Sequence, residues 1–133
     1  MEEVAIQVEA DINPTEDAEK VKNAILNIFD IVSVEIKPSY RGNILNAKAE
    51  GIETLVRFRN LLSLDRIRAA ARKVFLGSLR GNNIRFFLNK QVAFTGHVSF
   101  SEENGESPLG PMKITFECKD PKKLIDWLAP TKA

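Results

Sequence analysis

Residues 52–81, IETLVRFRNLLSLDRIRAAARKVFLGSLRG, are predicted to be helical, because apolar residues recur there with the period of about 3.6 that is typical of an α-helix. The pattern predicts two consecutive helices. Residues 60–63 interrupt it, and Ser63 is a good N-cap for a second helix that begins at Leu64. One apolar face of that second helix collects Leu64, Ile67, Ala71, Val74, Phe75 and Ser78. Gly81-Asn82-Asn83 is predicted to end it.

Three strands and a helix are predicted before this stretch. Val4, Ile6 and Val8 alternate with polar residues and predict a strand that ends near Asp11. The run Asn13-Pro14-Thr15-Glu16 has the composition of a helix start, with Asn13 as N-cap and Glu16 closing a capping box. Two further alternating runs predict a hairpin around a turn at residues 40–43. They are Val32, Val34 and Ile36 in one strand and Leu45, Ala47 and Ala49 in the other.

Strands return after the helical stretch. They are predicted at residues 84–88, 98–100 and 112–118, and the last two flank an acidic, Gly- and Pro-containing loop. Asp120-Pro121 repeats the cap-and-proline helix start, and Pro130 ends this short C-terminal helix. The order β-α-β-β-α-α-β-β-β-α therefore predicts a single α+β domain over residues 1–133. We expect a largely antiparallel sheet with helices packed on one face.

Positive charge is concentrated in and just after the helical stretch. Residues 52–90 hold nine Lys or Arg against two acids, a balance of 9 − 2 = +7, whereas the rest of the chain holds 10 − 16 = −6. The nine cations are Arg57, Arg59, Arg66, Arg68, Arg72, Lys73, Arg80, Arg85 and Lys90. A helix that needs only solubility usually mixes its signs. The imbalance indicates a negatively charged partner, most commonly a nucleic acid.

The sequence contains no catalytic or metal-binding signature. His97 is the only histidine, and its position before a strand predicts an exposed, inert side chain. Cys118 shares the strand parity of inward-facing residues and is predicted to be a small buried apolar residue. The seven glycines are scattered and form no phosphate-binding loop. We therefore expect a protein that is not an enzyme, with no cofactor and no metal.

The composition predicts a cytoplasmic protein. A chain of 133 residues with 44% apolar residues can build a core without disulfides, and its single cysteine fits a reducing compartment. The N-terminus lacks the pattern of a signal peptide. No stretch approaches the roughly 18 apolar residues of a membrane span, so no membrane association is expected.

The basic residues on one helical face are the candidate RNA-binding site. Arginine can bind a phosphate through two donors and can stack on a base. Arg85 and Lys90 would extend the patch from the sheet, and Tyr40 with Arg41 at the hairpin tip could add a stacking contact. Another use of the same charge remains open, since arginine is also a good helix former that can join salt networks within the fold or at a dimer interface.

The alternative function is a non-enzymatic protein-interaction module. It would be a homodimer, or a subunit that binds an acidic partner. The acidic loop at 102–106 of one copy would then meet the basic helix of another copy.

Several short motifs in the second half of the chain resemble one family. They are Asn89-Lys90-Gln91-Val92-Ala93, Gly96, Val98-Ser99-Phe100, Leu109-Gly110-Pro111 and Ile125-Asp126-Trp127-Leu128-Ala129-Pro130. The chain resembles, over almost its whole length, a family of uncharacterised archaeal proteins described as RNA-binding and in places as predicted exosome subunits. The resemblance implies a cytoplasmic archaeal protein with a fold like that of the five-S-RNA-binding protein of the large ribosomal subunit, and a dimer remains open. It also adds Gln91, beside Lys90, to the candidate RNA contacts.

Overall fold

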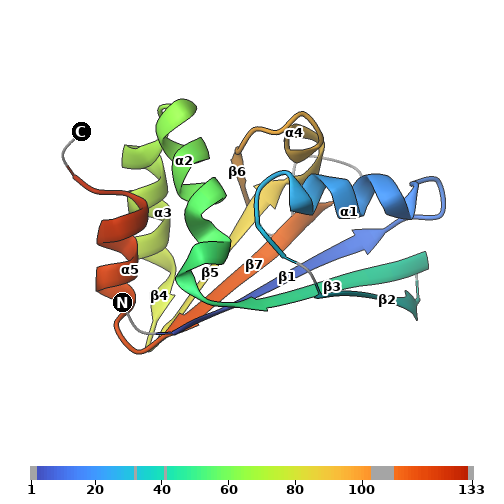
Figure 1. Ribbon diagram of the computed structural model, residues 1–133. Helices are drawn as coiled ribbons and strands as arrows, with labels where there is room; N and C mark the ends of the chain where they lie inside the picture. Colours follow the sequence, from blue (N-terminus) through green and yellow to red (C-terminus); the bar gives the residue numbers. More distant parts are fainter. Residues whose placement is uncertain (1–2, 32, 41, 103–109, 132–133) are drawn as a thin grey trace.

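A computed structural model describes residues 3–31, 33–40, 42–102 and 110–131 (Figure 1). The strands are β1 (Val4–Ile12), β2 (Ser33–Ser39), β3 (Gly42–Glu50), β4 (Leu79–Arg80), β5 (Asn83–Asn89), β6 (Phe100–Ser101) and β7 (Pro111–Cys118). The helices are α1 (Ala18–Leu26), α2 (Val56–Leu64), α3 (Arg68–Ser78), α4 (Lys90–Phe94) and α5 (Pro121–Leu128), and a 3₁₀ turn, η1 (Ile52–Leu55), leads into α2.

The strands form one seven-stranded sheet with helices on one side. Its order is β2-β3-β1-β7-β5-β4, and β6 also pairs with β5. All of these pairs are antiparallel. In the described part of the chain, the helices cover one face of the sheet and leave its other face free of helices (Figure 1). The predicted α+β architecture is therefore confirmed.

Alternation along the strands decides which side chains face the helices. In β1, Val4, Ile6 and Val8 are buried, whereas Gln7 between them is exposed. The register places Ile6 opposite Ala49 of β3 and Phe116 of β7, so apolar residues share the covered face. The uncovered side, called the open face below, carries the residues of opposite parity. These include Gln7, Glu9, Lys48, Arg85, Phe87, Lys113 and Thr115.

Phenylalanine rings join the helices to the sheet. Phe58 of α2 lies at the centre of this cluster, and its ring centroid is 5.0 Å from that of Phe29 and 5.9 Å from that of Phe86. Phe116 of β7 and Phe75 of α3 complete the contacts at 6.0 and 6.2 Å. Burial of such rings is the main favourable term in holding a helical layer on a sheet.

The break between the middle helices lies later than the sequence predicts. Helix α2 continues through the expected interruption at 60–63 and ends at Leu64, so Ser63 is not an N-cap. Leu64 is 75% exposed, because it belongs to α2 rather than to the apolar face of α3. The continuation buries Leu62 under the helical layer, and this packing outweighs the local cap signal.

The turn after α2 is a Schellman motif without glycine. Arg66 adopts a left-handed conformation with φ 56° and donates its N–H to the Ser63 carbonyl at 3.1 Å. Ile67 donates to the Leu62 carbonyl at 3.0 Å, which completes the motif. Asp65 stabilises the same corner, since its carboxylate accepts from the Val98 N–H at 3.1 Å and lies 3.0 Å from His97 Nδ1. His97 is exposed as predicted, and its ring contacts the Asp65 carboxylate.

The first helix also begins later than predicted. Its N-cap is Asp17, whose carboxylate accepts from the Glu19 N–H at 2.9 Å. The predicted cap, Asn13, instead belongs to a turn in which Glu16 reaches back to the Asn13 N–H at 2.9 Å. The capping-box contact is thus present, but it closes a turn rather than starting the helix.

The elements after α3 differ from the prediction in three places. The helix ends at Ser78 rather than at Gly81, because Leu79 and Arg80 pair with β5 as the two-residue strand β4. Helix α4 was not predicted, and only Phe100 and Ser101 form the strand expected from Val98. The C-terminal helix is as predicted, with Asp120 as its N-cap and Pro121 in its first turn.

The conformation of Arg66 generates a stability prediction. A side chain in the left-handed region costs about 1 kcal/mol that glycine avoids, so Arg66→Gly should raise the free energy of unfolding by about 0.5–1 kcal/mol. Chemical denaturation measures the change. Lys73→Gly is the matched control, because it removes a cation from the interior of α3 and should lower stability by about 1 kcal/mol. Loss of stability in both variants would contradict the Schellman assignment.

Candidate nucleic-acid interface

Two arginines of the basic stretch bind the C-terminal end of α5. Arg59 of α2 donates from Nε to the Trp127 carbonyl at 2.8 Å, and its guanidinium lies 5.1 Å from the centre of the Trp127 ring. Arg72 of α3 donates from Nη1 to the Ala129 carbonyl at 3.2 Å and to the Asp126 carboxylate at 2.7 Å. The last carbonyls of a helix have no partner within it and carry partial negative charge. These arginines therefore hold α5 against α2 and α3.

Arg57 has the same structural role at the end of α1. It donates to the Leu26 carbonyl and lies 3.6 Å from the carboxylate of Asp30. Three of the nine cations are thus engaged within the fold, as the salt-network alternative expects.

Lys90 is buried, and the prediction that it contacts RNA is wrong. Its side chain has no exposed surface. The ammonium donates to the Asp11 carbonyl at 2.7 Å and to the Glu16 carboxylate at 3.1 Å, which ties α4 to the end of β1. A cation enclosed in this way cannot reach a phosphate outside the protein.

The other five cations have no carboxylate within 4 Å in the part of the chain that the structure describes. They are Arg66, Arg68, Lys73, Arg80 and Arg85. Arg80 folds back onto main-chain carbonyls of its own turn, at 2.8 Å from Leu79 and 3.2 Å from Gly77. The positive charge that is left to contact a ligand is therefore smaller than the sequence suggests. The positions of these side chains determine what they can bind.

A groove between α3 and the segment after α5 brings two of these cations together, Arg68 and Lys73. It has a volume of about 580 Å³. It is lined by Arg68, Ala69, Arg72, Lys73, Leu76, Pro130 and Thr131. Arg68 and Lys73 supply positive charge, whereas Leu76, 44% exposed, and Pro130 supply apolar surface. Arg72, held by Asp126, joins the groove wall to α5.

The remaining predicted contacts lie elsewhere. Arg85 is on the open face, behind the sheet. Tyr40 is fully exposed at the tip of the β2–β3 hairpin. Strand β2 lies at the opposite end of the molecule from α3 (Figure 1). Gln91 is exposed on α4, and neither it nor Tyr40 lines the groove. Arg41 and all but the first residue of the acidic loop at 102–106 lie outside the described residues. The predicted contact residues thus lie in separate parts of the structure and do not form one site.

Four groove residues were not suggested by the sequence: Ala69, Leu76, Pro130 and Thr131. Leu76 carries a signal that could have identified it, because it is an apolar residue off the predicted apolar face of α3. Pro130 and Thr131 reach the groove only because α5 packs on α3, which no local pattern predicts.

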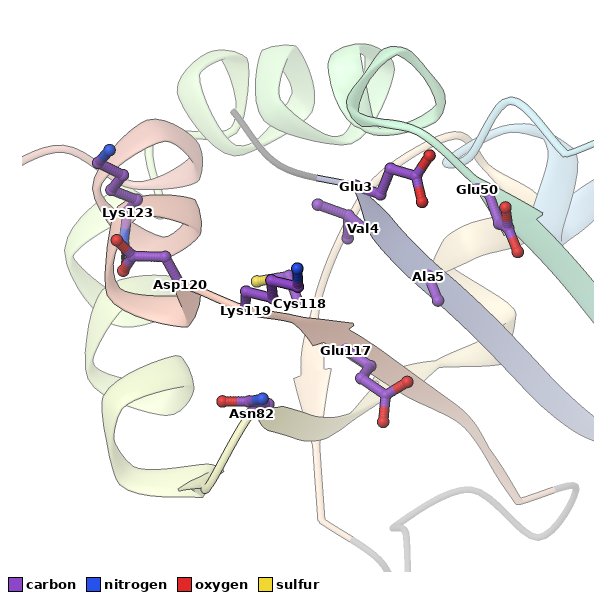
Figure 2. A pocket seen from close by; sticks show the side chains of 10 residues that line it. All are labelled: Glu3, Val4, Ala5, Glu50, Asn82, Glu117, Cys118, Lys119, Asp120 and Lys123. Carbon is purple, nitrogen blue, oxygen red and sulfur yellow. Dashed lines mark hydrogen bonds between the residues drawn. The ribbon is translucent and has the colours of Figure 1, made fainter.

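A larger hollow of about 1080 Å³ lies at the end of the sheet where β1 begins and β7 ends (Figure 2). Glu3, Glu50, Glu117 and Asp120 line it, with Lys119 and Lys123, so acids predominate and a phosphate would be repelled. No three His, Cys, Asp or Glu side chains within the described ranges group closely enough to hold a metal ion.

Cys118 borders the same hollow but is buried, as predicted. Burial raises the pKa of its thiol above the ordinary value, and the neighbouring Asp120 carboxylate also disfavours the thiolate. The thiol is therefore protonated at neutral pH, which does not suit a nucleophile.

No helix in the described parts of the chain has the length and apolar character needed to cross a bilayer.

Comparisons with known proteins agree on one family. A family model described as RNA binding matches residues 5–118. A UPF0201 protein of Sulfurisphaera tokodaii is 44% identical over 128 residues, covering 96% of this chain and 88% of the relative. A UPF0201 protein of Sulfolobus acidocaldarius is 43% identical, covering 95% of this chain and 87% of the relative. The crystal structure of a UPF0201 protein from Methanococcus jannaschii matches with a TM-score of 0.82 and 30% identity, covering 96% of this chain and 99% of that one.

The buried ion pair of Lys90 generates a prediction. Lys90→Met leaves the Glu16 carboxylate enclosed without its cation, so the free energy of unfolding should fall by about 3–5 kcal/mol. Lys119→Met, at an exposed position, is the control and should change it by less than about 0.5 kcal/mol. Denaturant titration of both variants measures the difference. If Lys90→Met kept full stability and lost RNA affinity, the structural role assigned to Lys90 would be wrong.

Proposed function

The chain belongs to the UPF0201 family, and from that premise we propose that it binds RNA through the groove along α3. One observation carries the proposal: Arg68 and Lys73 face the groove without a carboxylate partner among the described residues, beside exposed apolar surface. The description of the matching family model as RNA binding supports the choice of ligand.

The chemistry of the groove suits a single-stranded RNA. Arg68 can bind a phosphate through two parallel donors, and Lys73 adds a point charge five residues later on the same helix. Leu76 and Pro130 offer a surface against which a base or ribose can pack. A volume of about 580 Å³ is that of a pocket for one small organic ligand, so it accommodates about one or two nucleotides rather than a duplex.

Most of the binding free energy is proposed to come from phosphates. The groove offers few side chains that could distinguish one base from another, so we expect weak sequence preference. With Arg66 near the start of α3 included, about three phosphates would be neutralised. The logarithm of the affinity should then fall with the logarithm of salt concentration at a slope of about −2.

The protein is proposed to act by binding, not by catalysis. Cys118 and His97, the single cysteine and the single histidine of the sequence, do not line the groove, and Cys118 is buried. The cytoplasmic location, the exosome association and the likeness to the five-S-RNA-binding ribosomal protein, all implied by the resemblance, stay predictions.

Charge reversal in the groove tests the proposal. The double variant Arg68→Glu/Lys73→Glu should weaken binding of a fluorescently labelled, unstructured RNA oligonucleotide at least tenfold, because two phosphate contacts become repulsive. Fluorescence anisotropy at several salt concentrations gives both the affinity and the salt slope.

The open face supplies the matched control. Lys48→Glu/Arg85→Glu makes the same change in net charge on two exposed residues of the sheet. This control should keep RNA affinity within about threefold of that of the unmodified protein. A change of that size would come from the long-range effect of the altered net charge. If RNA binding survived in the groove variant and was lost in the control variant, RNA would bind the open face of the sheet and the proposal would be wrong.

A further inference from the structure

Strand β2 forms a long unpaired edge of the sheet. It runs for seven residues and pairs only with β3 among the described strands. The opposite edge consists of the two-residue strands β4 and β6, which leave little main chain to pair with. A long exposed edge strand is a template for pairing with another strand.

The register of the hairpin shows which main-chain groups face outward. Ser39 and Gly42 flank the two-residue turn, so they form a hydrogen-bonded pair, and every second residue back along β2 also bonds to β3. The N–H and C=O groups of Val34 and Ile36 therefore point away from the sheet. Pro38 has the same orientation as Val34 and Ile36. Its nitrogen therefore faces outward, and its lack of an N–H removes no hydrogen bond to β3.

The side chains of β2 are sorted by face. Val34, Ile36 and Pro38 are all apolar and lie on the helix-covered side, where Ile36 is 44% exposed. Glu35 and Lys37 lie on the open face, 3.4 Å apart, and both are largely exposed. The edge thus offers an apolar strip on one side and a pair of opposite charges on the other.

We propose that two copies of this chain pair antiparallel along β2, with Ile36 on the two-fold axis. In this register Ile36 donates its N–H to the carbonyl of the partner's Ile36, and Val34 donates to the carbonyl of the partner's Pro38. Glu35 faces Lys37 of the partner subunit, and Lys37 faces the partner's Glu35, so each charge meets its opposite. The apolar strips of both copies meet on the covered side and bury Ile36.

Neighbouring registers are less favourable. A centre on Glu35 or on Lys37 would set like charges directly opposite each other. A centre on Pro38 would place two residues without an N–H opposite each other. The strand sequence is therefore self-complementary about Ile36.

The paired sheet would leave both RNA grooves open. Helix α3 packs on β5, near the other edge of the sheet, and not on β2. At about 4.8 Å between neighbouring strands, the two β5 strands of the dimer would lie roughly 40 Å apart. The inference does not depend on the proposed RNA binding, since it concerns a different edge of the molecule.

Charge variants of β2 test the inference. In sedimentation equilibrium the unmodified chain should show a concentration-dependent rise in mass from 14.9 kDa towards 2 × 14.9 = 29.8 kDa. Glu35→Lys alone and Lys37→Glu alone should each weaken the dimer about tenfold or more, because each sets like charges opposite one another at two symmetric places. An equimolar mixture of these two variants should regain the dimer, because each charge then meets its opposite across the interface.

Lys48→Glu is the control, because Lys48 is exposed on the open face of the neighbouring strand and the change in charge is the same as in Lys37→Glu. It should leave the dimer intact. A chain that stays monomeric at millimolar concentration would overturn the inference. A dimer that survives both β2 variants would also overturn it and would place the interface elsewhere, for example between the acidic loop and the basic helix.

Discussion

The contact of arginine side chains with the C-terminal carbonyls of α5 is the interaction on which the groove along α3 depends. Arg59 and Arg72 come from two different helices and both bind the final turn of α5. A charged donor to a helix-end carbonyl is stronger than a neutral hydrogen bond, and it satisfies a group that the helix leaves unpaired. The same contacts set the segment after α5 against α3, and the groove exists because of that placement.

These contacts also decide which cations can meet a ligand. The sequence correctly predicted a strongly positive segment, but the fold uses its members in different ways. Arg57, Arg59 and Arg72 bind carbonyls and carboxylates, and Lys90 is enclosed with Glu16. Every residue has a carbonyl acceptor, so the amino-acid composition does not show which arginines bind main-chain carbonyls. Counting acids along the chain could not reveal these contacts. These four cations are engaged within the fold, RNA contact by the others stays a prediction, and only the packed structure could make that division.

The difference between local sequence signals and tertiary packing also explains which elements the sequence predicted. Strands with one covered face follow a strict alternation, and Val4, Ile6 and Val8 were placed correctly by it. Asp120 with Pro121 started α5 as predicted, because the cap and the proline act within one turn. Ser63 failed as a cap because burial of Leu62 favours a longer α2. The following turn was missed because an arginine, Arg66, occupies the position where glycine is the usual signal. Helix α4 has an Asn89 cap but only five residues, too few for a periodic pattern.

A two-dimensional NMR titration of isotopically labelled protein with an unstructured RNA oligonucleotide would show whether RNA binds in the groove along α3. We expect the amide shifts to change along α3 from Arg68 to Leu76 and at Thr131, and to change little in β1, β5 and β7. Shift changes concentrated at Gln7, Arg85 and Thr115, with α3 unaffected, would contradict this expectation and would assign RNA binding to the open face of the sheet.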